Sequence, residues 1–162
     1  VWQWIIQLGK DRGGWYVPAW LERFTRDTLL SGVHYIDPKF QQLGVGDFIP
    51  EYGPGSPLFK VMQMERPRVL VYLSLRDPSA NWAWPSNEDS FPKDTFAFSW
   101  SFMLDEIGNN QCRLQIRFRS QREGKAVPRL FYLFGGLIDY LTIVLMFAGL
   151  RERLHASWAV RS

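Results

Sequence analysis

The residues from Leu130 to Leu150 form an almost uninterrupted apolar run, and this run constrains the fold more than any other part of the chain. Basic residues flank it at Arg129 and Arg151, and Asp139 is the one acid within it. The run predicts a helix at about 128–154, and a helix that is apolar on most of its surface must bury more than one face. One face would pack on the protein's own sheet, and the other on an apolar ligand, a partner protein or a lipid bilayer.

The length of the run also raises the question of a membrane span, because a spanning helix needs roughly twenty apolar residues. Asp139 near the middle and the Gly135-Gly136 pair argue against a span. Three interpretations remain open. The helix only closes a pocket, it closes a pocket and also docks on a membrane or a partner, or it spans a bilayer.

Before this run the apolar residues alternate with a period of two, which is typical of strands that are buried on one face. Phe48-Ile49 is short, Leu58 to Met64 and Val69 to Leu75 form one predicted hairpin, and residues 96–104 and 112–118 form a second. The second hairpin has an arginine-bearing face and an aromatic face. With two short helical segments before residue 25, the order of elements predicts an α+β fold with antiparallel strands.

Composition narrows the protein class. The chain has 162 residues, of which 46% are hydrophobic and 22% are charged, so a single domain over residues 1–162 is expected. Aromatic residues make up 16%, including eight Trp, and such an excess often lines cavities or interfaces. The net charge of +3 comes without a basic run, which argues against nucleic acid as a partner. Cys112 is the only cysteine; it excludes an intrachain disulfide, and we expect it to be buried.

Several short motifs occur in a fixed order along most of the chain. They are Val1 to Gly9 with Arg12-Gly13-Gly14-Trp15-Tyr16, Phe40-Gln41-Gln42-Leu43, Val45-Gly46-Asp47, Arg68-Val69-Leu70-Val71 and Ser99-Trp100-Ser101-Phe102. In this order the motifs resemble a bacterial pattern of the SRPBCC superfamily, the START-like helix-grip proteins, in its branch of polyketide cyclase-like and lipid-binding proteins.

The resemblance implies a curved antiparallel sheet wrapped around the long C-terminal helix, with an apolar tunnel between them. It also implies binding of lipids, polyketides or other hydrophobic small molecules. The chain departs from the family in two ways. The family has a first strand and the start of its first helix before the Trp-x-Trp stretch, and we expect these to be absent from the given sequence or supplied by sequence upstream of Val1. In addition, Ile143, Val144 and Leu145 stand where relatives carry charges on the outer face of the helix.

Candidate ligand-binding residues follow from this architecture. They are Trp4, Arg12, Trp15, Tyr16, Trp100, Phe102, Phe118 and Asp139. The aromatic members would supply apolar contacts, whereas Arg12, Tyr16 and Asp139 would orient a polar group of the ligand. Asp139 either faces the cavity, where loss of hydration disfavours its charge unless a cation such as Arg12 reaches it, or lies exposed on the outer face of the helix.

A second set of residues is expected to contact a membrane or a protein partner. Trp82 and Trp84 lie in the long connection between residues 77 and 94, and Ile143, Val144 and Phe147 lie in the apolar run. Exposed loops seldom carry large aromatic side chains without a use. The alternative is that the loop packs its own aromatic residues as a small separate cluster.

The sequence offers little for catalysis. His34 and His155 are the only histidines, and both are expected at the surface rather than as bases. No nucleophile, metal-ligand or phosphate-loop pattern is present, so no cofactor, metal or catalytic residue is predicted. The expected function is binding of a hydrophobic small molecule or lipid, in the cytoplasm and possibly at a membrane. The alternatives are a polyketide cyclase or aromatase, and an accessory subunit of a membrane protein complex.

Overall fold

The computed structural model describes residues 1–24, 32–52, 55, 57–86, 94–122 and 129–159, and within these ranges the side chains of residues 122, 129–136, 139 and 157–159 lie outside the description. The chain forms two compact units. Unit 1 comprises Val1, residues 3–42 and residues 127–162, and unit 2 comprises Trp2 and residues 43–126. The expectation of one START-like domain stays a prediction.

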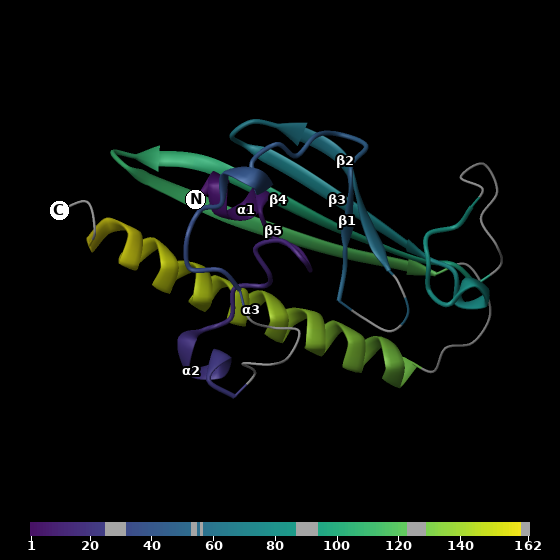
Figure 1. The fold of residues 1–162 in the computed structure, drawn as a ribbon. Coiled ribbons are helices and arrows are strands. Elements are labelled where there is room, and N and C mark those ends of the chain that lie inside the picture. The colour runs from purple at the N-terminus through teal and green to yellow at the C-terminus, as the bar shows by residue number, and fades with distance from the viewer. Residues whose placement is uncertain (25–31, 53–54, 56, 87–93, 123–128, 160–162) are drawn as a thin grey trace. The chain divides into compact units, whose positions relative to one another are not determined.

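Unit 2 is built on a five-stranded antiparallel sheet in the order β1-β2-β3-β4-β5, so each strand pairs with its neighbour in sequence (Figure 1). The strands are β1 (Phe48–Pro50), β2 (Leu58–Glu65), β3 (Val69–Arg76), β4 (Phe96–Gly108) and β5 (Gln111–Arg122). A short 3-10 helix, η2 (Pro78–Ala80), follows β3. These elements confirm the α+β class and both predicted hairpins. The strands form where apolar and polar residues alternate, because such a strand buries one face and leaves the other wetter.

The register of the sheet places the large apolar side chains in rows. Tyr72 on β3 is opposite Trp100 on β4, and Trp100 is opposite Phe118 on β5. Directly opposed residues point to the same face of a sheet and their side chains touch. A slip by one residue would move the whole set to the other face, so the burial pattern itself holds the register.

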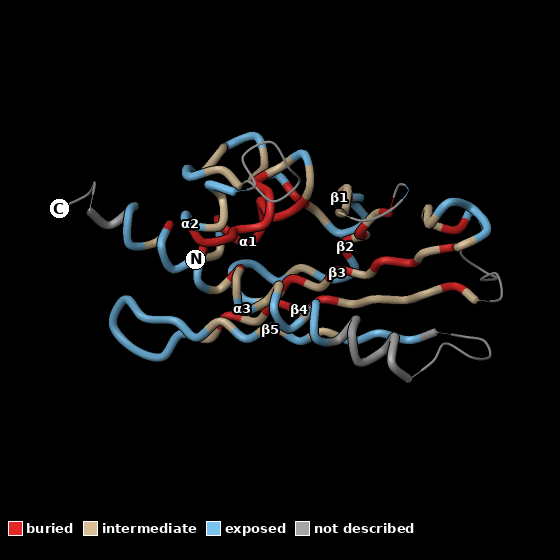
Figure 2. Tube along the Cα trace, turned by 90° about the horizontal axis from the view of Figure 1, so that it is seen from below, coloured by how far each residue is buried: buried red, intermediate tan, exposed pale blue. Residues whose placement is uncertain are grey.

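The two faces of the β4–β5 hairpin differ in burial. Trp100 and Phe102 are buried on one face, whereas Arg117 and Arg119 on the other are exposed, which confirms the prediction of a dry and a wet face. Toward its turn the hairpin is exposed on both faces (Figure 2). The expectation for Cys112 is therefore wrong: it is exposed, because it lies in this outer part of the hairpin.

Unit 1 contains the helical segments. They are α1 (Trp2–Ile6), α2 (Ala19–Glu22), the 3-10 helix η1 (Pro38–Phe40) and α3 (Arg129–Ala159). The predicted long helix is confirmed, and it continues five residues beyond the expected end at Leu154, because neither Gly nor Pro occurs in that stretch to stop it. Among the described residues, no helix is both long enough and apolar enough to cross a membrane.

The core of unit 1 forms where α1, the segment after it and α3 meet. Ile5, Tyr16 and Met146 are almost completely buried, and the buried part of α1, Trp4 to Ile6, continues into the segment after the helix (Figure 2). A Cβ atom at Gly149 would lie 2.4 Å from the carbonyl oxygen of Tyr16 and 2.5 Å from that of Val17. The helix therefore approaches the Tyr16-Val17 backbone more closely than any residue with a side chain allows.

Candidate ligand-binding site

One face of the unit 2 sheet carries a continuous series of aromatic side chains, which we call the aromatic face. Its members are Phe59, Tyr72, Phe96, Phe98, Trp100, Phe102 and Phe118. Neighbouring ring centroids lie 5.6 Å to 6.2 Å apart, as between Trp100 and Phe118 and between Phe96 and Phe98. These spacings are those of favourable offset and edge-to-face ring pairs.

Burial is uneven along the aromatic face. Trp100 and Phe102 are 5% and 1% exposed and act as core residues of unit 2. Phe96, Phe98 and Phe118 are only half-buried, and they lie toward the start of β4 and the end of β5. This part of the face keeps apolar surface accessible, and it is the part of unit 2 best suited to contact an apolar ligand.

A polar cluster of Glu51, Ser74 and Arg76 adjoins the half-buried end of the aromatic face. The Ser74 hydroxyl donates a hydrogen bond of 2.8 Å to one carboxylate oxygen of Glu51, and Nη2 of Arg76 pairs with the other. The Arg76 guanidinium lies over the Phe98 ring, 4.7 Å from its centroid. Ser74 is fully buried, so the cluster is part of the sheet face and not a surface ion pair.

The loop after β3 packs its tryptophans against unit 2. Trp82 lies 5.6 Å from Phe96, and Trp84 lies 5.1 Å from Phe48 in an edge-to-face arrangement. Lys60 lies over the Trp84 ring at 5.6 Å. Both tryptophans are half-buried. These contacts agree with the alternative of a loop that packs its own aromatic residues, and the expected contact of Trp82 and Trp84 with a membrane or partner stays a prediction.

In unit 1, three of the predicted ligand-binding residues lie in the core. Trp4, Trp15 and Tyr16 are buried, and the rings of Trp4 and Tyr16 meet edge to face at 5.3 Å. The Tyr16 hydroxyl donates a hydrogen bond of 2.7 Å to the Trp4 carbonyl oxygen. Burial raises the pKa of Tyr16 well above its ordinary value, although a hydrogen bond with Gln7 and the charge of Arg153 oppose the shift. Tyr16 therefore stays a neutral donor.

Arg12 links the last residue of α1 to the last residue of η1. One of its terminal nitrogens, Nη2, donates hydrogen bonds of 2.9 Å to the carbonyl oxygens of Ile6 and Phe40. Its guanidinium also lies over the Phe40 ring, 5.0 Å from the centroid. The proposed partner of Arg12, Asp139, lies outside the described side chains, and the role of Arg12 in orienting a ligand stays a prediction.

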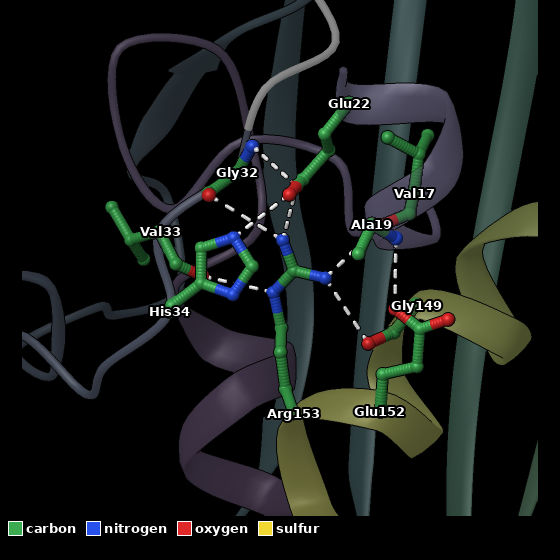
Figure 3. Close-up of polar contacts among 9 residues, drawn as sticks. All are labelled: Val17, Ala19, Glu22, Gly32, Val33, His34, Gly149, Glu152 and Arg153. Atoms are coloured by element: carbon green, nitrogen blue, oxygen red, sulfur yellow. Dashed lines mark hydrogen bonds and ion pairs between the residues drawn. The ribbon is translucent and has the colours of Figure 1, made fainter. Parts of the chain in front are cut away.

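Arg153 of α3 is the centre of a buried polar cluster in unit 1 (Figure 3). Its side chain is 1% exposed and pairs with Glu22 at 2.5 Å. The remaining N–H groups donate to backbone carbonyl oxygens. These belong to Val33 at 2.9 Å, Val17 at 3.1 Å, Gly149 at 3.1 Å and Gly32 at 3.4 Å. Every guanidinium nitrogen thus has an acceptor, which is the condition for burying a cation without a large penalty.

Glu22 links this cluster to the surface. It accepts hydrogen bonds from the Gly32 N–H at 3.3 Å and pairs with the exposed His34 ring at 2.8 Å. Burial acts to raise the pKa of Glu22, but the hydrogen bond and charge of Arg153, helped by His34 and Gly32, outweigh it. The pKa of Glu22 therefore lies below its ordinary value. The cluster clamps α3 to α2 and to the residue 32–34 segment.

The described part of α3 has an exposed apolar stretch. The large apolar residues exposed there are Leu137, Ile138, Tyr140, Leu141 and Val144. Of the residues predicted to contact a membrane or partner, Val144 is 43% exposed, whereas Ile143 and Phe147 are half-buried. His155 is exposed near the end of the same helix.

The structure sorts the predicted ligand-binding residues into two groups. Trp100, Phe102 and Phe118 come together on the aromatic face of unit 2, and Trp4, Trp15 and Tyr16 come together in the core of unit 1. Sequence reasoning missed the clusters around Arg76 and Arg153. Arg76 had a weak signal, because it ends an apolar strand pattern. Arg153 had another, because it lies three residues beyond the last residue of the apolar run. Nothing in the sequence pointed to Glu22, Glu51 or Ser74 as their partners.

Among the described residues, no group of three or more His, Cys, Asp and Glu side chains is arranged to hold a metal ion. Comparisons with protein-family models, with curated proteins and with solved structures found no match for this chain.

Proposed function

We propose that the protein binds a hydrophobic small molecule or a lipid, and that the half-buried end of the aromatic face makes the main contact. The observation that carries the proposal is the continuous series of rings from Phe59 to Phe96 on one side of the unit 2 sheet. No catalytic step belongs to the proposal.

The energetics support binding of an apolar ligand at this place. Each square ångström of apolar surface removed from water contributes roughly 25 cal/mol, so covering the accessible parts of Phe96, Phe98 and Phe118 is favourable. Rings held in place by neighbouring rings lose little conformational entropy when a ligand binds. An apolar ligand thus gains contact area on the aromatic face at a small cost in conformational entropy.

The helix-grip arrangement and the SRPBCC assignment are the finer part of the same proposal. In that arrangement the long helix would provide the second wall of an apolar cavity. Support comes from the sequence resemblance and from two elements that the family also has, an antiparallel sheet and a long C-terminal helix.

Binding of Nile red, a neutral apolar dye, tests the proposal. We expect the purified protein to bind the dye with a blue-shifted emission, and native mass spectrometry after gentle extraction to show a retained apolar ligand. Phe98→Ala should weaken dye binding about tenfold or more, because a half-buried ring that contacts the ligand contributes on the order of 1 to 3 kcal/mol.

Met103→Ala is the matched control. Met103 lies on the same strand as Phe98 but on the opposite face of the sheet, and it is also half-buried, so its truncation should leave dye binding unchanged. An equal loss for both variants, or a folded wild-type protein that does not bind the dye, contradicts the proposal.

A second candidate function is contact with a membrane surface or a protein partner through α3. The exposed stretch that includes Leu137, Leu141 and Val144 favours it, because clustered exposed apolar side chains mark interaction surfaces. Sedimentation with liposomes tests the membrane form of this function. Wild-type protein should co-sediment, and Leu141→Glu should stay in the supernatant. Equal sedimentation of both proteins contradicts it.

A further inference from the structure

The aromatic face ends at a charged cluster with a defined geometry. Ser74 is opposite Phe98, and Arg76 is opposite Phe96, so both polar side chains belong to the same face as the rings. The side chains of Arg76 and Glu51 are only 18% and 10% exposed. A ligand that covers Phe96 and Phe98 therefore reaches the edge of this cluster.

Arg76 keeps donor capacity beyond its contacts in the protein. Its Nη2 pairs with Glu51, and its Nε donates to the Ser74 hydroxyl at 3.4 Å. Among the described residues, the hydrogen bonds of Arg76 involve Nε and Nη2 and leave Nη1 available. A guanidinium has five N–H donors in one plane, so Arg76 holds further N–H groups beside the Phe98 ring that an oxygen atom of a ligand would satisfy.

The charges of the cluster determine which oxygen suits it. Arg76 and Glu51 carry opposite charges at contact distance, so their combined charge is zero. An uncharged oxygen receives the Arg76 hydrogen bond without a penalty. A carboxylate at the same place would stand beside the Glu51 carboxylate in a poorly hydrated environment, where like charges repel strongly.

The geometry points to a ligand that has an apolar body and one uncharged oxygen, such as an alcohol, a ketone or an ester. The apolar body covers Phe96 and Phe98, and the oxygen accepts a hydrogen bond from Arg76. Glu51 sets the preference against anionic ligands, and Ser74 holds the Glu51 carboxylate in place. This inference names the ligand class of the proposed binding function and rests on it.

A matched set of three probes tests the ligand class: naphthalene, 2-naphthol and 2-naphthoate, each measured by displacement of Nile red at pH 7.5. At this pH the carboxyl of 2-naphthoate is ionised and the hydroxyl of 2-naphthol is neutral. For the wild-type protein we expect 2-naphthol to bind at least about tenfold more tightly than 2-naphthoate. The Glu51 carboxylate repels the carboxylate of 2-naphthoate, and an interaction between charges in poorly hydrated surroundings changes affinity by roughly this factor or more.

Two variants assign the preference to the cluster. Glu51→Gln keeps the shape of the side chain and removes its charge, so 2-naphthoate should gain about tenfold in affinity while naphthalene stays unchanged. Glu51→Gln/Arg76→Met removes both charges, so that neither is left unpaired, and it should weaken 2-naphthol about tenfold without affecting naphthalene. Circular dichroism confirms the fold of each variant.

The outcomes separate this inference from the function on which it rests. If Nile red and naphthalene do not bind the wild-type protein, the proposed function fails. If both bind, but wild-type protein takes 2-naphthoate as tightly as 2-naphthol, the ligand class is overturned and the binding function stands. The same conclusion follows if both folded variants leave the ratios among the three affinities unchanged. The comparison of 2-naphthol with 2-naphthoate uses wild-type protein alone, so it tests the ligand class even if a variant does not fold.

Discussion

At the scale of single residues, the buried Arg153 and the half-buried Arg76 show how this chain places charge in poorly hydrated surroundings. Arg153 is the more buried of the two, and it uses one carboxylate and four backbone carbonyl oxygens as acceptors. A buried ion pair contributes little net stability when it is compared with apolar residues, but the loss of one partner leaves an uncompensated charge. Arg153 should therefore be sensitive to substitution.

Replacement of Arg153 by Met should lower the free energy of unfolding by about 3 to 5 kcal/mol, because the half-buried Glu22 loses its cation and four backbone carbonyl oxygens lose their donor. Urea denaturation measures this change. Arg151→Met is the matched control: Arg151 is exposed on the same helix, and its loss should change the free energy by less than about 0.5 kcal/mol. Similar values for the two variants contradict the assigned role of Arg153.

The lowered pKa of Glu22 predicts a stability that depends on pH. The pKa of Glu22 in the unfolded chain lies near its ordinary value of 4.5, and the pKa of Glu22 in the folded protein is lower. As pH falls below about 4.5, the unfolded state therefore takes up a proton that the folded state does not bind, and the free energy of unfolding decreases. Below the pKa of Glu22 in the folded protein, both states bind the proton and this decrease in the free energy of unfolding ends. Above the pKa of Glu22 in the unfolded chain, the ionised Glu22 makes its full contribution to the free energy of unfolding.

Urea denaturation between pH 3 and pH 7 tests this prediction, with Glu22→Gln as the comparison. The wild-type protein should lose more stability on acidification than the variant, because the variant lacks the titrating group. A pH dependence that is the same in both proteins contradicts the assignment to Glu22.

At the scale of elements, α3 depends on one close approach. Gly149 lies against the carbonyl oxygens of Tyr16 and Val17, where a Cβ would meet backbone atoms at 2.5 Å or less. Backbone atoms cannot rotate away as the end of a flexible side chain does, so an added methyl group must push the helix from its position.

Gly149→Ala should therefore destabilise the protein by about 1 to 3 kcal/mol, although Ala favours an isolated helix over Gly by about 1 kcal/mol. Thermal unfolding followed by circular dichroism measures the sign of the change. Ala148→Ser is the control at the neighbouring exposed position and should be close to neutral. A Gly149→Ala variant that is more stable than the wild-type protein contradicts the close approach.

At the scale of the whole molecule, the open question is whether the two units act as one domain. The START-like expectation predicts one cooperative unfolding transition, as small single domains show. Unit 1 contains the Arg153 cluster and unit 2 contains the aromatic face. A substitution in unit 1 with a readout in unit 2 therefore shows whether the two units unfold together or separately.

Hydrogen exchange measured by mass spectrometry provides this readout. In a single domain, Arg153→Met should reduce the protection of β3 and β4 by a factor similar to that for α1 and α3, because global unfolding limits exchange in all of them. Loss of protection that is restricted to unit 1 contradicts the one-domain expectation.

Much of the secondary structure was predictable, because it depends on local pattern. The alternation around Trp100 and Phe118 predicts strands since a period of two matches the pleat, and the run from Leu130 to Leu150 predicts a helix because of its length. Cys112 shows the limit of this reasoning. Its place in an alternating strand is that of a buried residue, but the sequence does not say where along the strand the core ends.

The sequence alone therefore determined the elements, their order and the division of the β4–β5 hairpin into two faces, since each follows from residues close together in the chain. Only the tertiary structure decided the partners of the buried charges. Arg153 pairs with Glu22 from a distant part of unit 1, and Arg76 at the end of β3 pairs with Glu51, which directly follows β1. Charged residues look alike in sequence whether they are exposed or buried, and long-range packing chooses the few that meet an oppositely charged partner.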